Sequence, residues 1–308
     1  MITLKQLEEY AQQNDIIVGM TAARVFDELK KPLERKVPFV GYSLEERIDP
    51  ARTLENAKTV ICIGYPYPQE ISADRGISIA ASGEDYHTLV KSALEKLKTF
   101  LGIDGLAFSD TGPLVDRYVA YLCGLGYYGK NGFIINEKFG TLFFIGYIIT
   151  AEGADNYSTP VKGSCGDCRR CLDACPTGAI NGGEMAYESC ISCITQIKGV
   201  LSKERMKSLR GRVYGCDACQ LSCPKNSGKI KISTRETGYE HFFDMNNRQF
   251  KEKYGNTGIA WRGRATIVRN AMTAFINTGG DKSKIEKFLA DDNEVLKNTA
   301  KMLLCKTY

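Results

Sequence analysis

The chain has 308 residues, 43% of them hydrophobic and 25% charged, which is enough for about two domains with ordinary cores. Its most apolar run, residues 141–150, has only the length of a strand, and the first ten residues carry no apolar signal segment, so a membrane protein is excluded. The formal net charge is +5, and 12 cysteines are too dilute for a disulfide framework. We therefore expect a soluble monomer of the reducing cytoplasm.

The first 155 residues alternate between predicted helices and strands. Apolar periodicity predicts helices over residues 3–13, 84–101 and about 114–123, and another around 22–31 that ends before Pro32. Buried strands are predicted over residues 16–20, 59–67, 133–136 and 141–149. This alternation predicts an α/β or α+β first domain.

Residues 261–304 show helical periodicity in segments separated by 277–281 and 291–293. They predict one short HEAT-like repeat. Because one repeat cannot form a solenoid, it should pack on the preceding domain. A plain helical hairpin that caps the core is the alternative.

The most specific pattern is a pair of cysteine runs, each closed by a proline. Residues 165–176 read Cys-x-x-Cys-x-x-Cys-x-x-x-Cys-Pro, and residues 216–224 read Cys-x-x-Cys-x-x-x-Cys-Pro. The first spacing is that of bacterial ferredoxins, in which the fourth cysteine of a run binds the other of two [4Fe-4S] clusters. Crossed ligand sets are therefore predicted: Cys165, Cys168, Cys171 and Cys223 for cluster 1, and Cys175, Cys216, Cys219 and either Cys190 or Cys193 for cluster 2.

Zinc is the alternative ligand, because Cys-x-x-Cys pairs also bind it, but zinc does not need seven cysteines in this order followed by prolines. The remaining cysteines, Cys62, Cys123 and Cys305, are interpreted as small hydrophobic residues, together with whichever of Cys190 and Cys193 is not a ligand.

Three further motifs lie in the first domain. Residues 124–129 match the GxGxxG pattern, but a predicted helix precedes them and a strand follows, which is the wrong context for dinucleotide binding. Residues 85–90 are similar to the DxHxxG motif of some corrinoid proteins, but Val90 replaces the glycine, so they are interpreted as a helix first turn. Asp110 fits a turn or helix cap, or a general acid whose pKa apolar surroundings would have to raise.

Taken together, these residues resemble the epoxyqueuosine reductase family. The resemblance rests on residues 47–50, 83–87, 110–113, 124–126, 129–131, 165–176, 190–192 and 214–220. It implies reduction of epoxyqueuosine to queuosine at the wobble position of tRNA, the last step of queuosine biosynthesis, with two [4Fe-4S] clusters and a base-off cobalamin. It also implies Cys190 as the cluster ligand and Asp110 as proton donor. The implied cobalamin contacts are Arg47, Ala80, Asp110, Ile134, Ile145 and Asp217.

The predicted architecture is thus α+β with three domains. They are a cobalamin-binding α/β domain (1–155), a ferredoxin-like two-cluster domain (156–235) and the HEAT-like segment (236–308). A low-potential electron donor, whose identity the sequence does not reveal, must supply the clusters. Residues 80–87 differ from the family pattern, and the C-terminal repeat is short, so one aromatic near the corrinoid and part of the tRNA surface should be missing.

The expected partner is a tRNA anticodon stem-loop. Residues 198–269 contain 16 Lys and Arg against 6 Asp and Glu, which favours a polyanion. The candidate tRNA contacts are Lys198, Arg212, Arg262, Arg264 and Arg269. Two alternatives are weaker: a corrinoid reductive dehalogenase normally has an export signal and a tyrosine acid, and a ferredoxin-type carrier needs only residues 160–230.

Overall fold

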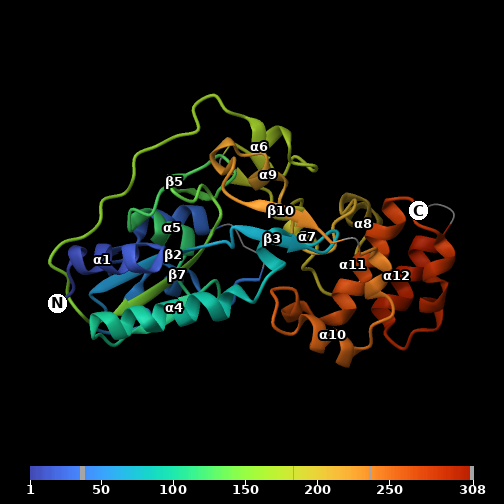
Figure 1. Cartoon of the computed structure of the whole chain (residues 1–308), viewed down its shortest axis with the longest axis horizontal. Coiled ribbons are helices and arrows are strands. Elements are labelled where there is room, and N and C mark those ends of the chain that lie inside the picture. The colour runs from blue at the N-terminus through green and yellow to red at the C-terminus, as the bar shows by residue number, and fades with distance from the viewer. Residues whose placement is uncertain (35–38, 183, 236, 306–308) are drawn as a thin grey trace. The chain divides into compact units, whose positions relative to one another are not determined.

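The computed structural model describes residues 1–34, 39–182, 184–235 and 237–305, which divide between two compact units (Figure 1). The first unit contains residues 1–67, 87–169 and 223–229, and the second contains 68–86, 170–222 and 230–308. Each unit therefore combines segments that are distant in sequence. Among the described helices, none has the length and apolar character of a membrane span. The division into three functional domains stays a prediction.

A four-stranded antiparallel sheet forms the centre of the first unit (Figure 1). The strand order is β1 (Ile17–Ala22), β2 (Thr59–Pro66), β7 (Phe143–Thr150) and β4 (Leu106–Ser109). Because successive side chains of a strand point to opposite faces, β2 sends Val60 and Cys62 into one core and Ile61 and Ile63 into another. The predicted mixed α/β fold is confirmed.

Helices cover both faces of this sheet. The helices α1 (Leu4–Asn14) and α4 (Tyr86–Leu101) pack on the face that carries Ile61, and α5 (Asp116–Leu122) packs on the other. The last of these leads through residues 124–126 to the hairpin of β5 (Tyr127–Tyr128) and β6 (Ile134–Ile135). The helix-then-strand context predicted for the GxGxxG match is confirmed.

The predicted helix around residues 22–31 is wrong. The strand β1 continues to Ala22, and a 3-10 turn at Asp27–Leu29 leads into α2 (Lys30–Leu33), followed later by α3 (Leu44–Ile48). Pro32 therefore lies in the first turn of a helix. A proline is tolerated there because the amide of that position has no intrahelical partner.

The second unit is mainly helical around a small parallel pair of strands, β3 (Glu70–Ala73) and β10 (Lys231–Thr234). A second short pair is β8 (Ile180–Asn181) with β9 (Glu184–Met185). Its α-helices are α6 (Arg170–Asp173), α7 (Ile191–Ile194), α8 (Lys203–Ser208), α9 (Ala218–Leu221), α10 (Asn247–Tyr254), α11 (Gly263–Asn277) and α12 (Glu294–Leu304). Residues Lys282–Ala290 form a 3-10 helix.

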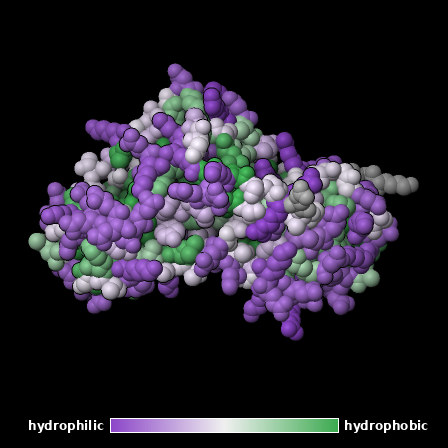
Figure 2. All heavy atoms as spheres, in the orientation of Figure 1, coloured by the Kyte–Doolittle hydropathy of each residue, from purple (hydrophilic) through white to green (hydrophobic). Residues whose placement is uncertain are grey.

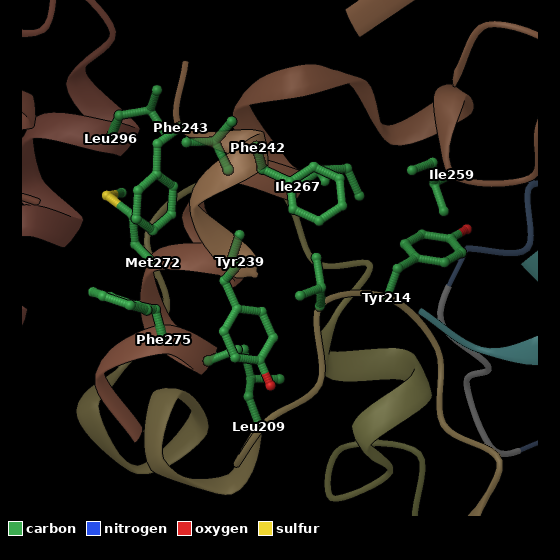
Figure 3. Close-up of a cluster of buried hydrophobic side chains, with 14 of the residues drawn as sticks. Leu209, Tyr214, Tyr239, Phe242, Phe243, Ile259, Ile267, Met272, Phe275 and Leu296 are labelled. Carbon is green, nitrogen blue, oxygen red and sulfur yellow. The ribbon is translucent and has the colours of Figure 1, made fainter. Parts of the chain in front are cut away.

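The core of the second unit gathers around α11, where ten successive residues from Thr266 to Phe275 are buried. Figure 3 shows Phe243 and Phe275 among the aromatic and aliphatic side chains of this core, and their rings meet edge to face with centroids 5.6 Å apart. Hydrophilic residues cover most of the face of this unit that Figure 2 shows. The HEAT-like nature of α11 and α12 stays a prediction.

Candidate active site

Asp110 lies directly after β4, in the loop that leads to α5. Its backbone φ of 58° is in the left-handed region, which non-glycine residues rarely adopt and which aspartate tolerates better than most. Its Oδ2 lies 3.6 Å from Nε2 of His87, near the start of α4, and 61% of its side chain is exposed. An exposed carboxyl beside an imidazole is chemically able to exchange protons with a bound substrate.

The Asp110 loop is held against Tyr147, which lies in the middle of β7. The amide of Leu114 donates to the Tyr147 hydroxyl at 2.9 Å. Gly112 passes so close that an added Cβ would lie 2.0 Å from this hydroxyl. The Tyr42 hydroxyl donates to the carbonyl of Thr111 at 3.1 Å. The sheet thus fixes the loop, and only glycine fits at position 112.

A second carboxyl, Asp116, was missed by the sequence reasoning. Its Oδ1 is shielded from solvent and makes no hydrogen bond to any residue that the structure describes. Burial and then the charge of Asp110 raise the pKa of Asp116 to about 8, although a backbone hydrogen bond at Asp116 and the charges of Arg117 and Arg47 act in the opposite direction. The shielded carboxyl of Asp116 therefore favours its protonated form. The available sequence signal was a lone acid in the apolar stretch that follows Pro113.

The residues predicted to contact cobalamin divide between the two units. The first unit contains Arg47, Asp110, Ile134 and Ile145, and the second contains Ala80 and Asp217. Within the second unit, the carboxylate of Asp217 accepts a hydrogen bond from the amide of Ile79, the neighbour of Ala80, at 3.0 Å. Burial raises the pKa of Asp217 to about 6. These residues stay predicted contacts.

The cysteines of the two runs have cysteine neighbours within each unit, and none of the 12 cysteines is in a disulfide. In the first unit, burial raises the pKa of Cys223, and Cys165 and Cys168 add to this effect. In the second unit, burial raises the pKa of Cys216, and Cys190 contributes. Such thiol neighbours are what crossed ligand sets require, and the sets themselves stay predictions.

Lys130 anchors the first cysteine run and was not assigned a role from the sequence. Its ammonium group donates to the carbonyls of Gly166 at 2.6 Å and Cys168 at 3.0 Å. Both carbonyls belong to the turn that carries Cys165 and Cys168. In the described part of the chain, no group of three or more His, Cys, Asp or Glu is arranged to hold a single metal ion.

One predicted tRNA contact is wrong. Arg269 is fully buried, because α11 runs through the core of the second unit. Its guanidinium donates to the carbonyls of Ile197 and Gly199 and to the side chain of Asn270, so it is not available to RNA. The other four candidates, Lys198, Arg212, Arg262 and Arg264, are exposed or half-buried.

Family models match two parts of the chain. The model described as "4Fe-4S double cluster binding domain" matches residues 164–226, and the one described as "Epoxyqueuosine reductase QueG, DUF1730" matches residues 47–116. The fold and the first match define an iron–sulfur protein of mixed α/β architecture.

Similar proteins cover nearly the whole chain. The epoxyqueuosine reductase of Staphylococcus aureus is 36% identical over 83% of this chain and 75% of its own, and that of Bacillus subtilis is 34% identical over 96% and 85%. A crystal structure of an epoxyqueuosine reductase with an epoxyqueuosine-modified tRNA stem loop matches with a TM-score of 0.89, at 32% identity over 97% of this chain and 88% of that one. The Streptococcus thermophilus enzyme matches with a TM-score of 0.87, at 34% identity over 97% and 89%. The chain belongs to the epoxyqueuosine reductase family.

Proposed function

We propose that this protein reduces epoxyqueuosine to queuosine at the wobble position of tRNA. The observation that carries the proposal is the similarity, over 97% of the chain, to a reductase crystallised with an epoxyqueuosine-modified stem loop. The reaction removes the epoxide oxygen as water and consumes two electrons and two protons. The protein must therefore conduct electrons, supply protons and hold a tRNA loop.

Two [4Fe-4S] clusters would carry the electrons one at a time from a low-potential donor. The cysteines of the two runs suit such clusters, since iron–sulfur clusters are bound by cysteine thiolates. The proposed ligands are Cys165, Cys168, Cys171 and Cys223 for cluster 1, and Cys175, Cys190, Cys216 and Cys219 for cluster 2. Lys130, by fixing the carbonyls of Gly166 and Cys168, holds the first of these turns in place.

Cobalamin, when bound, would supply a cobalt centre that passes electrons to the substrate carbon. The residues proposed to hold it are Arg47, Ala80, Asp110, Ile134, Ile145 and Asp217. Ser109, next to Asp110, supports such a site. Its buried hydroxyl has no hydrogen-bond partner among the described residues, which suits a pocket completed by a polar group from outside the chain.

Asp110 is the proposed general acid. It would protonate the epoxide oxygen as the C–O bond opens, a contribution typically worth about 10²- to 10⁴-fold in rate. His87, 3.6 Å away, is placed to orient this carboxyl. The modified base has to leave the anticodon stack to reach a protein site, and single-stranded loops are bound by stacking and by basic side chains. Lys198, Arg212, Arg262 and Arg264 are the proposed basic contacts.

The test is the replacement Asp110→Asn, which keeps the shape of the side chain but removes the proton. Turnover of an epoxyqueuosine stem-loop should fall by about 10²- to 10⁴-fold, while bound iron and stem-loop affinity stay at wild-type values. Asp104→Asn is the matched control, because Asp104 is an exposed acid of the same unit. Wild-type turnover by the Asp110 variant would remove the acid assignment.

A further inference from the structure

The carboxyl of Asp116 has no role in the function proposed so far. Asp116 is the first residue of α5, six positions after Asp110. Its Oδ1 is buried and accepts no hydrogen bond from the described residues. At Oδ1, an ionised carboxylate would lose its hydration without gaining a hydrogen bond from a described residue, so burial favours the neutral acid.

The groups that face Asp116 do not reverse this preference. Arg117 is engaged elsewhere: it donates to the carbonyl of Gly132 at 3.0 Å and its guanidinium lies 4.3 Å from the centre of the Phe133 ring. A backbone hydrogen bond at Asp116 and the charge of Arg47 of α3 favour the ionised form, and burial and Asp110 favour the neutral one. From the sheet, Tyr147 and Cys62 face it, and burial keeps both of these neutral by raising their pKa values. The balance leaves Asp116 with a pKa of about 8.

The proposed reaction creates a need for such a group. A general acid must carry its proton when the substrate arrives, whereas carboxyls open to water are generally ionised at neutral pH. Asp110 is 61% exposed, so the chain around it does not provide the dry surroundings that the sequence reasoning required. Asp116 is only half-buried, but its Oδ1 is shielded from solvent.

We propose that Asp116 stores the proton that Asp110 delivers to the substrate. This inference rests on the proposed function. When the flipped nucleotide covers Asp110 and excludes solvent from its carboxyl, the proton passes from Asp116 to Asp110. Asp110 then gives this proton to the epoxide oxygen as the C–O bond breaks. The two electrons come from the low-potential donor, and solvent supplies the second proton with which the oxygen leaves as water.

The test is the pH dependence of Asp116→Asn, whose amide cannot release a proton. Wild-type turnover should fall as the pH rises above about 8, where Asp116 loses its proton. The variant should turn over at least about tenfold more slowly at pH 7 and should not show that fall. Asp104→Asn, the exposed acid of the same unit, should keep the wild-type profile. A wild-type rate and profile in Asp116→Asn would overturn the proposal.

Infrared difference spectroscopy gives a readout that needs no turnover. Wild-type protein titrated through pH 8 should lose a carboxylic-acid carbonyl band that is missing from Asp116→Asn. If the spectra of the two proteins are the same, Asp116 does not hold the proton. A wild-type protein that leaves epoxyqueuosine unchanged refutes the proposed function instead, so the two failures are distinguishable.

A separate observation concerns Trp261, the single tryptophan of the sequence. Its side chain is 54% exposed on the second unit, yet its ring is held in place. The guanidinium carbon of Arg262 lies 3.4 Å from the ring centre, and the indole N–H donates to the hydroxyl of Tyr214, which is buried. A fixed aromatic ring beside a cation is a surface on which an unpaired base can stack.

We infer that Trp261 and Arg262 form a stacking site for an unpaired nucleobase of the tRNA loop, an inference that again rests on the proposed function. Because no other tryptophan contributes, fluorescence reports on this ring alone. Titration with an anticodon stem-loop should quench it, and a duplex without a loop should not. Trp261→Ala should weaken stem-loop binding by roughly 5- to 150-fold, and Trp261→Phe should retain most of the affinity. Unchanged affinity in Trp261→Ala overturns the site, whereas a wild-type protein that does not bind the stem-loop refutes the proposed function.

Discussion

The replacement Asn270→Ala tests how the core of the second unit supports the proposed cluster 2. The Asn270 amide donates to the carbonyls of Thr195 at 2.7 Å and Val213 at 2.8 Å, and its oxygen accepts two bonds from Arg269. Thr195 follows the segment that carries Cys190, and Val213 precedes Cys216. One buried amide is therefore hydrogen-bonded to both of the chain segments that carry or adjoin these cysteines.

The expected loss in the free energy of unfolding follows from the buried polar groups that the replacement leaves without a partner. Alanine removes four hydrogen bonds and leaves two buried carbonyls and a buried guanidinium without this partner. A buried polar group that loses its partner costs about 1–3 kcal/mol, so we expect the free energy of unfolding to fall by about 4 kcal/mol. For a unit of this size, that corresponds to a melting temperature lower by roughly 8–16 °C.

The assay is thermal unfolding under anaerobic conditions, followed by circular dichroism, together with bound iron per chain. The variant should also lose about half of its iron, because cluster 2 depends on the two segments. Asn298→Ala is the matched control, since that amide bonds to Glu294 within one turn of α12, and it should change the melting temperature by less than about 2 °C. A stable Asn270→Ala protein with full iron content would refute the reasoning.

Three further predictions concern the proton on Asp116, the cysteine ligands of cluster 2 and the Asp110 loop. The free energy of unfolding should fall with rising pH, by up to about 1.4 kcal/mol per pH unit between pH 4 and 8, because folded Asp116 keeps a proton that the unfolded chain has lost. Chemical denaturation of Asp116→Asn at several pH values should show a flatter dependence. A slope equal to that of the wild-type protein would contradict this. Cys190→Ser should lower bound iron by about four atoms per chain while Cys193→Ser should not, and elemental analysis with the opposite result would reverse the ligand choice. Gly112→Ala should slow turnover by about 10²-fold at full iron content, because its Cβ would lie 2.0 Å from the Tyr147 hydroxyl and move the loop; wild-type turnover would show that the loop geometry is not needed.

The central sheet could be predicted because β2 and β7 are long, apolar and buried. The strand β4 could not, since it has only four residues and lies at an edge of the sheet. The strands β3 and β10 pair across about 160 residues of sequence, and β10 is exposed along its whole length. Pairing of that kind depends on tertiary structure, which local periodicity does not contain.

The residues of the candidate site could likewise be predicted only where their role does not depend on tertiary structure. Cysteine spacing carries its own chemistry, so the cluster ligands could be proposed without a structure. The wrong prediction for Arg269 arose because a basic residue normally marks the surface, whereas α11 is buried on all sides. Asp116 was missed for the converse reason, since only packing reveals that a carboxyl oxygen is shielded and has no partner in the described structure.

The most direct measurement is mass spectrometry of the nucleosides from an epoxyqueuosine-containing tRNA stem-loop. The stem-loop is first incubated anaerobically with a chemical reductant and with protein that has been reconstituted with iron, sulfide and cobalamin. Conversion to queuosine, seen as the loss of one oxygen atom from the modified nucleoside and dependent on the iron–sulfur clusters, is the predicted result. Epoxyqueuosine that stays intact with fully loaded protein would contradict the account.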